Sequence, residues 1–150
     1  MEYVYGNNGK GTCPTKQSLL SFAGWPVHAR MVLQATDSAD VFCARLDALA
    51  AYADECAQVA DDAAFAASVP MAKFYADRAL LSAGLTRKVA QAAQAAARDG
   101  KIGAAIAAAQ TASEGAVDAS ECALRASRCA DDMDARSRLN AALVALLLVP

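Results

Sequence analysis

Three sulfur-bearing residues in the last third of the chain have a spacing that could bind a soft metal ion. Cys129 and Met133 follow Cys122 by seven and eleven residues, so on one continuous α-helix both lie within about 20° of Cys122. Thiolates and thioethers are the ligands that Cu(I) prefers, and thiolates also bind zinc. The two cysteines stand two helical turns apart, roughly 10 Å, so a single ion needs a ligand from a second helix. Cys56 is the residue that we expect to supply it.

The same stripe also fits the interior of a helical bundle, where cysteine behaves as a small apolar residue. We favour this interpretation, because the sequence contains no Cys-x-x-Cys pair and a single histidine, His28. No cofactor is therefore expected. A copper or zinc site that uses Cys56, Cys122, Cys129 and Met133 is kept as the alternative.

Enzyme chemistries fail on spacing or on missing partners. A nucleophilic cysteine or serine needs a base, and His28 is the only histidine in the sequence. The sequence has no Gly-x-Ser-x-Gly elbow and no Glu-x-x-His pair of a di-iron bundle. The glycine-rich stretch 6–12 lacks the four-residue gap of a phosphate-binding loop. We therefore predict that the chain is not an enzyme.

Charge and cysteine usage restrict the partners and the compartment. The formal net charge is −2 and the pI is about 5.3, which gives no electrostatic footprint for nucleic acid. The N-terminal stretch does not have the pattern of a secretion signal, so we expect a cytoplasmic protein with reduced, mainly buried thiols. The cysteines are odd in number: Cys13, Cys43, Cys56, Cys122 and Cys129.

The composition predicts helices. Alanine makes up 40 of the 150 residues, while aromatic residues make up only 6%. Alanine has the highest helix propensity, and no segment alternates with the period of two that a half-buried strand requires. We predict an all-α fold, an alanine-rich antiparallel bundle of four to five helices. This single domain covers residues 15–150, after a short irregular N-terminal arm at 1–14.

Apolar seams locate the individual helices. Two short helices are expected at 16–24 and 27–35, and long helices at 38–67 and 71–98. A last helical region runs from 101 to 149, with residues 113–115 as the expected interruption. The seam of the first long helix consists of Phe42, Leu46, Leu49, Ala53, Cys56, Ala60 and Ala63. The seam of the second consists of Met71, Phe74, Leu81, Leu85, Val89, Ala92 and Ala96.

Successive segments carry opposite charge. Residues 37–67 hold seven acids and one arginine, a net of −6, whereas residues 68–101 hold six bases and two acids, a net of +4. We expect the two helices to attract each other within the chain, although an acidic face offered to a basic partner is the alternative. Near the C-terminus, Arg136 and Arg138 stand four residues after Asp132 and Asp134, which predicts two ion pairs along one helix.

The C-terminal stretch is almost uniformly apolar. It is shorter than the roughly 20 residues that a membrane-spanning helix needs, so no membrane span is expected. A terminal helix that is apolar all round leaves surface for another molecule unless it is central in the bundle. We predict a non-enzymatic protein that acts through protein contacts, as a homo-oligomer, an assembly subunit or a small inhibitor, immunity or adaptor protein. The expected interface consists of Leu143, Val144, Leu146, Leu147 and Leu148.

Overall fold

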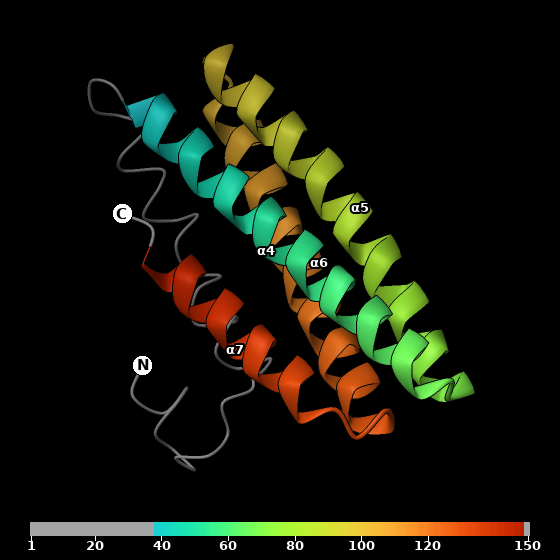
Figure 1. The fold of residues 1–150 in the computed structure, drawn as a ribbon. Coiled ribbons are helices and arrows are strands. Elements are labelled where there is room, and N and C mark those ends of the chain that lie inside the picture. Colours follow the sequence, from blue (N-terminus) through green and yellow to red (C-terminus); the bar gives the residue numbers. More distant parts are fainter. Residues whose placement is uncertain (1–37, 149–150) are drawn as a thin grey trace.

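The computed structural model describes residues 38–148, which form four α-helices. The predicted N-terminal arm and the two short helices expected at 16–24 and 27–35 lie outside this part of the chain. Each helix is joined to the next by a turn of two or three residues and runs antiparallel to it (Figure 1). The predicted all-α antiparallel bundle is confirmed. The helices are α4 (Ser38–Ala67), α5 (Pro70–Arg98), α6 (Ile102–Cys129) and α7 (Met133–Leu147).

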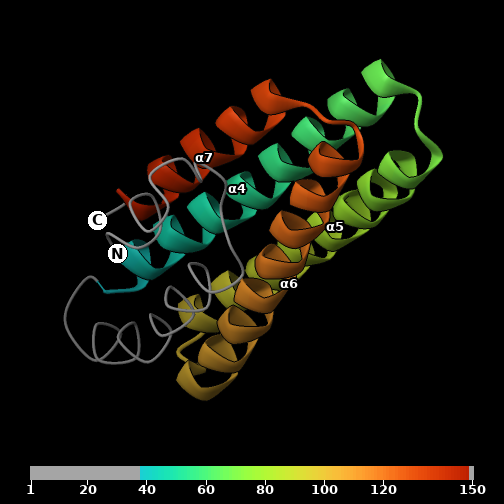
Figure 2. The same cartoon turned by 90° about the horizontal axis from the view of Figure 1, so that it is seen from below.

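Three long helices pack side by side, and the shorter α7 lies along α4. Figure 2 shows α7 beside α4, while α5 and α6 are paired on the other side of the bundle. The contacts between helices agree with this arrangement. The most extensive interfaces are those of α5 with α6 and of α4 with α5, and α7 contacts α4 more extensively than it contacts α6. Within residues 38–148 no helix is long and apolar enough to cross a membrane.

The helix ends follow from local chemistry. Pro70 occupies the first turn of α5, where its missing N–H has no intrahelical partner to lose. Gly100, with φ of 77°, adopts the left-handed conformation after the end of α5. Asp132 caps α7, because its carboxylate accepts a hydrogen bond from the backbone N–H of Ala135 at 3.0 Å.

The break in the last helical region was predicted in the wrong place. Residues 113–115 lie inside the continuous helix α6, and the chain turns at 130–132 instead. Gly115 serves helix packing there, since a Cβ added to it would lie only 2.4 Å from Oγ1 of Thr86 on α5. Thr86 is fully buried and donates its hydroxyl to the carbonyl oxygen of Ser82. The glycine therefore marks a close approach of two helices.

Alanines form the interface between α5 and α6. Successive members on both helices are three or four residues apart, which is the spacing of a coiled-coil seam. Because alanine side chains are short, the two backbones can approach closely over their whole length. The seam of α5 is Ala72, Ala76, Ala79, Ala83, Thr86, Ala90, Ala93 and Ala97. The seam of α6 is Ala105, Ala109, Ala112, Ala116, Ala119, Ala123 and Ala126.

This alanine seam overturns the predicted core face of α5. Phe74, Leu81 and Leu85 were expected to point inward, but their side chains are 51%, 75% and 56% exposed. They lie on the opposite side of the helix from the buried alanines. Met71 is 51% exposed as well, and Val89 is only partly buried. The large apolar residues of α5 therefore cover the outside of the bundle.

The predicted seam of α4 is confirmed, and it forms the bulky part of the core. All seven of its residues are buried. Leu139 and Leu143 of α7 are also fully buried in the same cluster. The large side chains of the core thus gather around α4 and α7, while the α5–α6 side is built from small residues.

Opposite charges on α4 and α5 do meet within the chain, as predicted. Nη2 of Arg87 lies 2.5 Å from Oδ1 of Asp54. On the other flank of α4, however, Arg138 of α7 reaches Asp62 at 2.9 Å and Glu55 at 3.5 Å. Hydrogen bonds from Arg138 and Gln58 lower the pKa of Asp62. The predicted pair of Arg138 with Asp134 is therefore wrong, because Arg138 bridges two helices instead. The predicted pair of Arg136 with Asp132 is not formed either, since the carboxylate of Asp132 accepts from the backbone of Ala135 and Arg136 contacts Met133.

Candidate interaction surface

The structure does not bring the four predicted metal ligands together. Cys56 of α4 is fully buried beside Tyr52 and Ser120, and burial raises the pKa of its thiol to about 12. Cys122 is buried too, but its charged neighbours include Arg78 of α5 and Asp118. Residues two apart in a helix point in directions that differ by about 200° around its axis. The side chain of Cys122 therefore leaves α6 on a different side from that of Ser120, which contacts Cys56.

The other two members of the predicted stripe are at the surface. Cys129, the last residue of α6, is exposed. Met133 begins α7 and is 63% exposed, with its sulfur contacted by the guanidinium of Arg136 at 3.5 Å. The expected alignment assumed a single helix through residues 122–133, and the turn at 130–132 removes it. Within the described part of the chain, no group of three or more His, Cys, Asp or Glu residues could hold a metal ion.

The predicted C-terminal interface is divided between the core and the surface. Leu143 and Leu146 are buried, and Leu147 packs against the core from a partly buried position. Only Val144 and Leu148 are exposed, at 36% and 75%. Residues of α7 that were expected to meet a partner therefore make most of their contacts within this chain.

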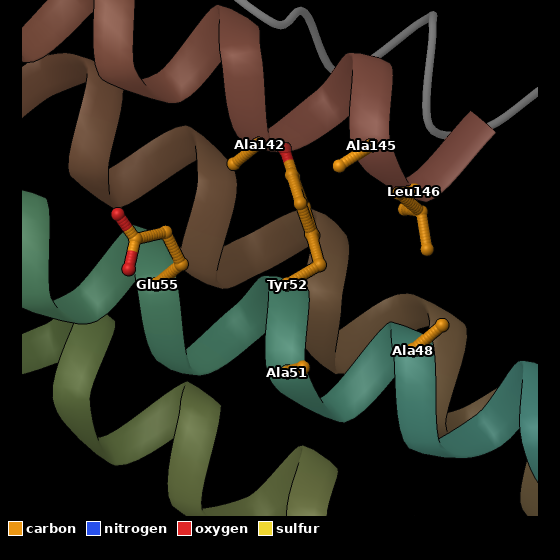
Figure 3. Close-up of a pocket in the computed structure, with 7 residues that line it drawn as sticks. All are labelled: Ala48, Ala51, Tyr52, Glu55, Ala142, Ala145 and Leu146. Atoms are coloured by element: carbon orange, nitrogen blue, oxygen red, sulfur yellow. The ribbon is translucent and has the colours of Figure 1, made fainter. Parts of the chain in front are cut away.

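A shallow groove of about 290 Å³ runs between α4 and α7. Figure 3 shows Tyr52 extending from α4 toward α7, where Ala142 and Ala145 line the opposite wall. The other lining residues are Ala48, Ala51, Glu55 and Leu146. The hydroxyl of Tyr52 donates to Oγ of Ser120 at 3.0 Å, and the carboxylate of Glu55 faces Arg138. Both polar groups are thus used in contacts that hold the bundle together.

The outer face of α5 is the largest feature that the sequence interpretation missed. Four big apolar side chains of α5 are each more than half exposed: Phe74 at 51%, Leu80 at 63%, Leu81 at 75% and Leu85 at 56%. Phe74, Leu81 and Leu85 lie on the outer face, and Leu80 lies on its flank, about 100° around the helix from Leu81. We call these four residues the α5 apolar face. Helix α5 itself lies on the side of the bundle away from α7 (Figure 1).

Charged residues border the α5 apolar face, and most of them are neutralised within the chain. Arg87 pairs with Asp54 of α4, and Arg78 lies 3.9 Å from Asp118 of α6. Ser82 donates a short hydrogen bond to the same Asp118. On α5 itself, Lys73 pairs with Asp77 at 2.8 Å. An apolar centre with a polar rim is the usual anatomy of a protein–protein contact surface.

A signal for this face was present in the sequence. Helix α5 carries two seams with helical spacing, one of alanines and one of Phe and Leu residues. The seam of larger residues was predicted to face inward, because burial of a large apolar side chain releases more free energy than burial of an alanine. The unbroken alanine spacing on both α5 and α6 indicates which seam is inward, since two such helices fit closely together.

Comparison of the chain with protein-family models, with curated proteins and with solved structures finds no match.

Proposed function

We propose that this chain is a non-enzymatic helical protein of the cytoplasm that acts through contacts with other protein molecules. It serves as an assembly subunit or as a small inhibitor, immunity or adaptor protein. The observation that carries the proposal is the inverted burial on α5, where alanines face inward and the α5 apolar face is turned to the outside.

Inverted burial has an energetic consequence. Complete burial of a Leu or Phe side chain contributes about 1.5–3 kcal/mol relative to full exposure. Each member of the α5 apolar face is more than half exposed. Burial of these side chains could therefore contribute roughly 1 kcal/mol more per residue than it does in the isolated chain. A second molecule that covers the α5 apolar face would gain this free energy of burial. Apolar residues grouped on one surface in this way mark interaction sites more often than isolated exposed leucines do.

Two further features support contact rather than catalysis. The polar groups of the α4–α7 groove are occupied by Ser120 and Arg138, so this groove does not offer a free acid and base. The buried thiol of Cys56 has a raised pKa, which opposes the thiolate form that a nucleophile needs.

The proposal predicts that charging the α5 apolar face will abolish assembly without unfolding the chain. Leu81→Glu combined with Leu85→Glu places two carboxylates at exposed positions, so the cost to the isolated fold is small, within about 1 kcal/mol. Ala104→Glu with Ala107→Glu adds the same charge to exposed positions of α6 and serves as the control. Molar mass from light scattering after size exclusion, for the purified protein and for the tagged protein in cell extract, gives the readout.

We expect assemblies to be lost in the α5 variant and retained in the α6 control, with similar thermal unfolding of both. Native-sized assemblies in the α5 variant, or an equal loss in the control, would rule out the α5 apolar face as the contact surface.

A further inference from the structure

A self-complementary pattern lies along the outer ridge of α5. Asp77, Leu81 and Lys88 all point within about 30° of the direction opposite the buried alanine seam. Asp77 and Lys88 lie at equal distances from a point between Ser82 and Ala83, roughly 8 Å on either side of it along the helix. Leu81 and Gly84 are placed symmetrically about the same point. An acid and a base at mirrored positions are what a helix needs in order to pair with an antiparallel copy of itself.

From this pattern we propose that a second copy of the chain covers the α5 apolar face, with the two α5 helices antiparallel and related by a two-fold axis. The inference rests on the proposed function and names the occupant of the same surface. With the crossing point between Ser82 and Ala83, Asp77 of each copy faces Lys88 of the other. Leu81 of each copy lies over Gly84 of the other. A two-fold axis uses one patch twice, so both contacts occur in duplicate.

Gly84 suits the crossing point of such a pair. A Cβ added at Gly84 would have no heavy atom of residues 38–148 within 4 Å, so packing within this part of the chain does not require a glycine there. Glycine in the middle of a helix costs about 1 kcal/mol relative to alanine. In the proposed pair, the missing side chain leaves room for Leu81 of the second copy, while Leu80 and Leu85 flank the crossing on either side.

The charges favour this antiparallel register. Lys88 is exposed. None of the ion pairs among residues 38–148 includes Lys88. Asp77 pairs with Lys73, but their side chains are 57% and 64% exposed, so this contact is easily exchanged for another. A parallel, in-register pair would set Lys88 against Lys88, which is unfavourable. Arg78 and Arg87 point about 70° and 110° away from this outward direction around the helix, and each lies beside a carboxylate, Asp118 and Asp54 respectively.

Charge reversal tests the pairing. Asp77→Lys places two bases at the paired positions, and Lys88→Asp places two acids there, so each variant alone sets like charges against each other. We expect dimer dissociation constants at least about tenfold higher than native for each variant, by sedimentation equilibrium on the full chain. An equimolar mixture of the two variants should form a heterodimer, because each base then meets an acid. The double variant Asp77→Lys with Lys88→Asp should recover the homodimer.

The failure of this inference can be told apart from the failure of the proposed function. A native chain that stays monomeric, or a mixture of the two variants without heterodimer, overturns the two-fold pairing. If assemblies with another protein are then still abolished by Leu81→Glu with Leu85→Glu, the α5 apolar face is a contact surface for that different partner. If neither set of substitutions changes any assembly, both proposals fail.

Discussion

Leu143→Ala is expected to lower the free energy of unfolding by about 2–5 kcal/mol, the cost of emptying a fully buried leucine site. Helix α7 has only 15 residues, and four of them are buried: Ala135, Leu139, Leu143 and Leu146. Losing one of its two fully buried leucines removes a large share of what holds α7 against α4. Denaturant unfolding followed by circular dichroism measures the change.

Val144→Ala is the matched control for this prediction, because its side chain is adjacent in sequence and 36% exposed. We expect its unfolding free energy to stay within about 0.5 kcal/mol of native. The comparison also tests the C-terminal interface that the sequence predicts. If Leu143→Ala kept native stability and instead reduced the molar mass of an oligomer, α7 would be the contact helix and its buried position would be wrong.

Gly115→Ala is expected to destabilise the protein by about 1–3 kcal/mol, although alanine has the higher helix propensity by about 1 kcal/mol. The added methyl group would lie 2.4 Å from Oγ1 of Thr86, so α5 and α6 must separate or Thr86 must rotate. Rotation breaks the hydrogen bond of Thr86 to the carbonyl of Ser82, and a β-branched side chain has few alternative rotamers. The same denaturant unfolding experiment provides the measurement.

Gly103→Ala on the same helix is the control, because a Cβ there meets no atom of the described residues within 4 Å. Its stability should be unchanged or slightly raised. Adding Thr86→Ala to Gly115→Ala removes Oγ1 of Thr86, the atom that the new methyl group meets. The double variant should therefore recover part of the lost unfolding free energy, so the effects of the two changes should not be additive. Equal stability of Gly115→Ala and Gly103→Ala would contradict the close contact of α5 and α6 at this point.

The extent to which the fold could be predicted depends on how many seams each helix carries. On α4, Phe42, Leu46 and Leu49 belong to one continuous seam of large apolar residues, and this inward face was predicted correctly. On α5, two seams compete, and hydrophobicity alone selects the wrong one. What decides is the fit between α5 and α6, a property of two helices that no single-helix pattern contains.

Two local features decide where the structure places the predicted site residues. The alignment of Cys122 with Met133 assumed an unbroken helix, whereas Asp131 has φ of 54° and Asp132 caps the next helix. At residues 143–148, every position but one is large and apolar, so periodicity could not indicate which side faces inward. The structure shows that Leu143 and Leu146 face inward, because α7 packs along α4.

The most direct test of the central claim is a photo-crosslinking residue placed at Leu81, in the middle of the α5 apolar face, in the full chain inside the producing cell. Thr111 is the matched position, exposed on α6 away from this face. We expect a protein adduct from position 81 whose crosslinked peptide, identified by mass spectrometry, includes residues of α5 of a second copy, and no adduct from position 111. The absence of any protein adduct at position 81, or equal adducts from both positions, would contradict a contact surface on α5.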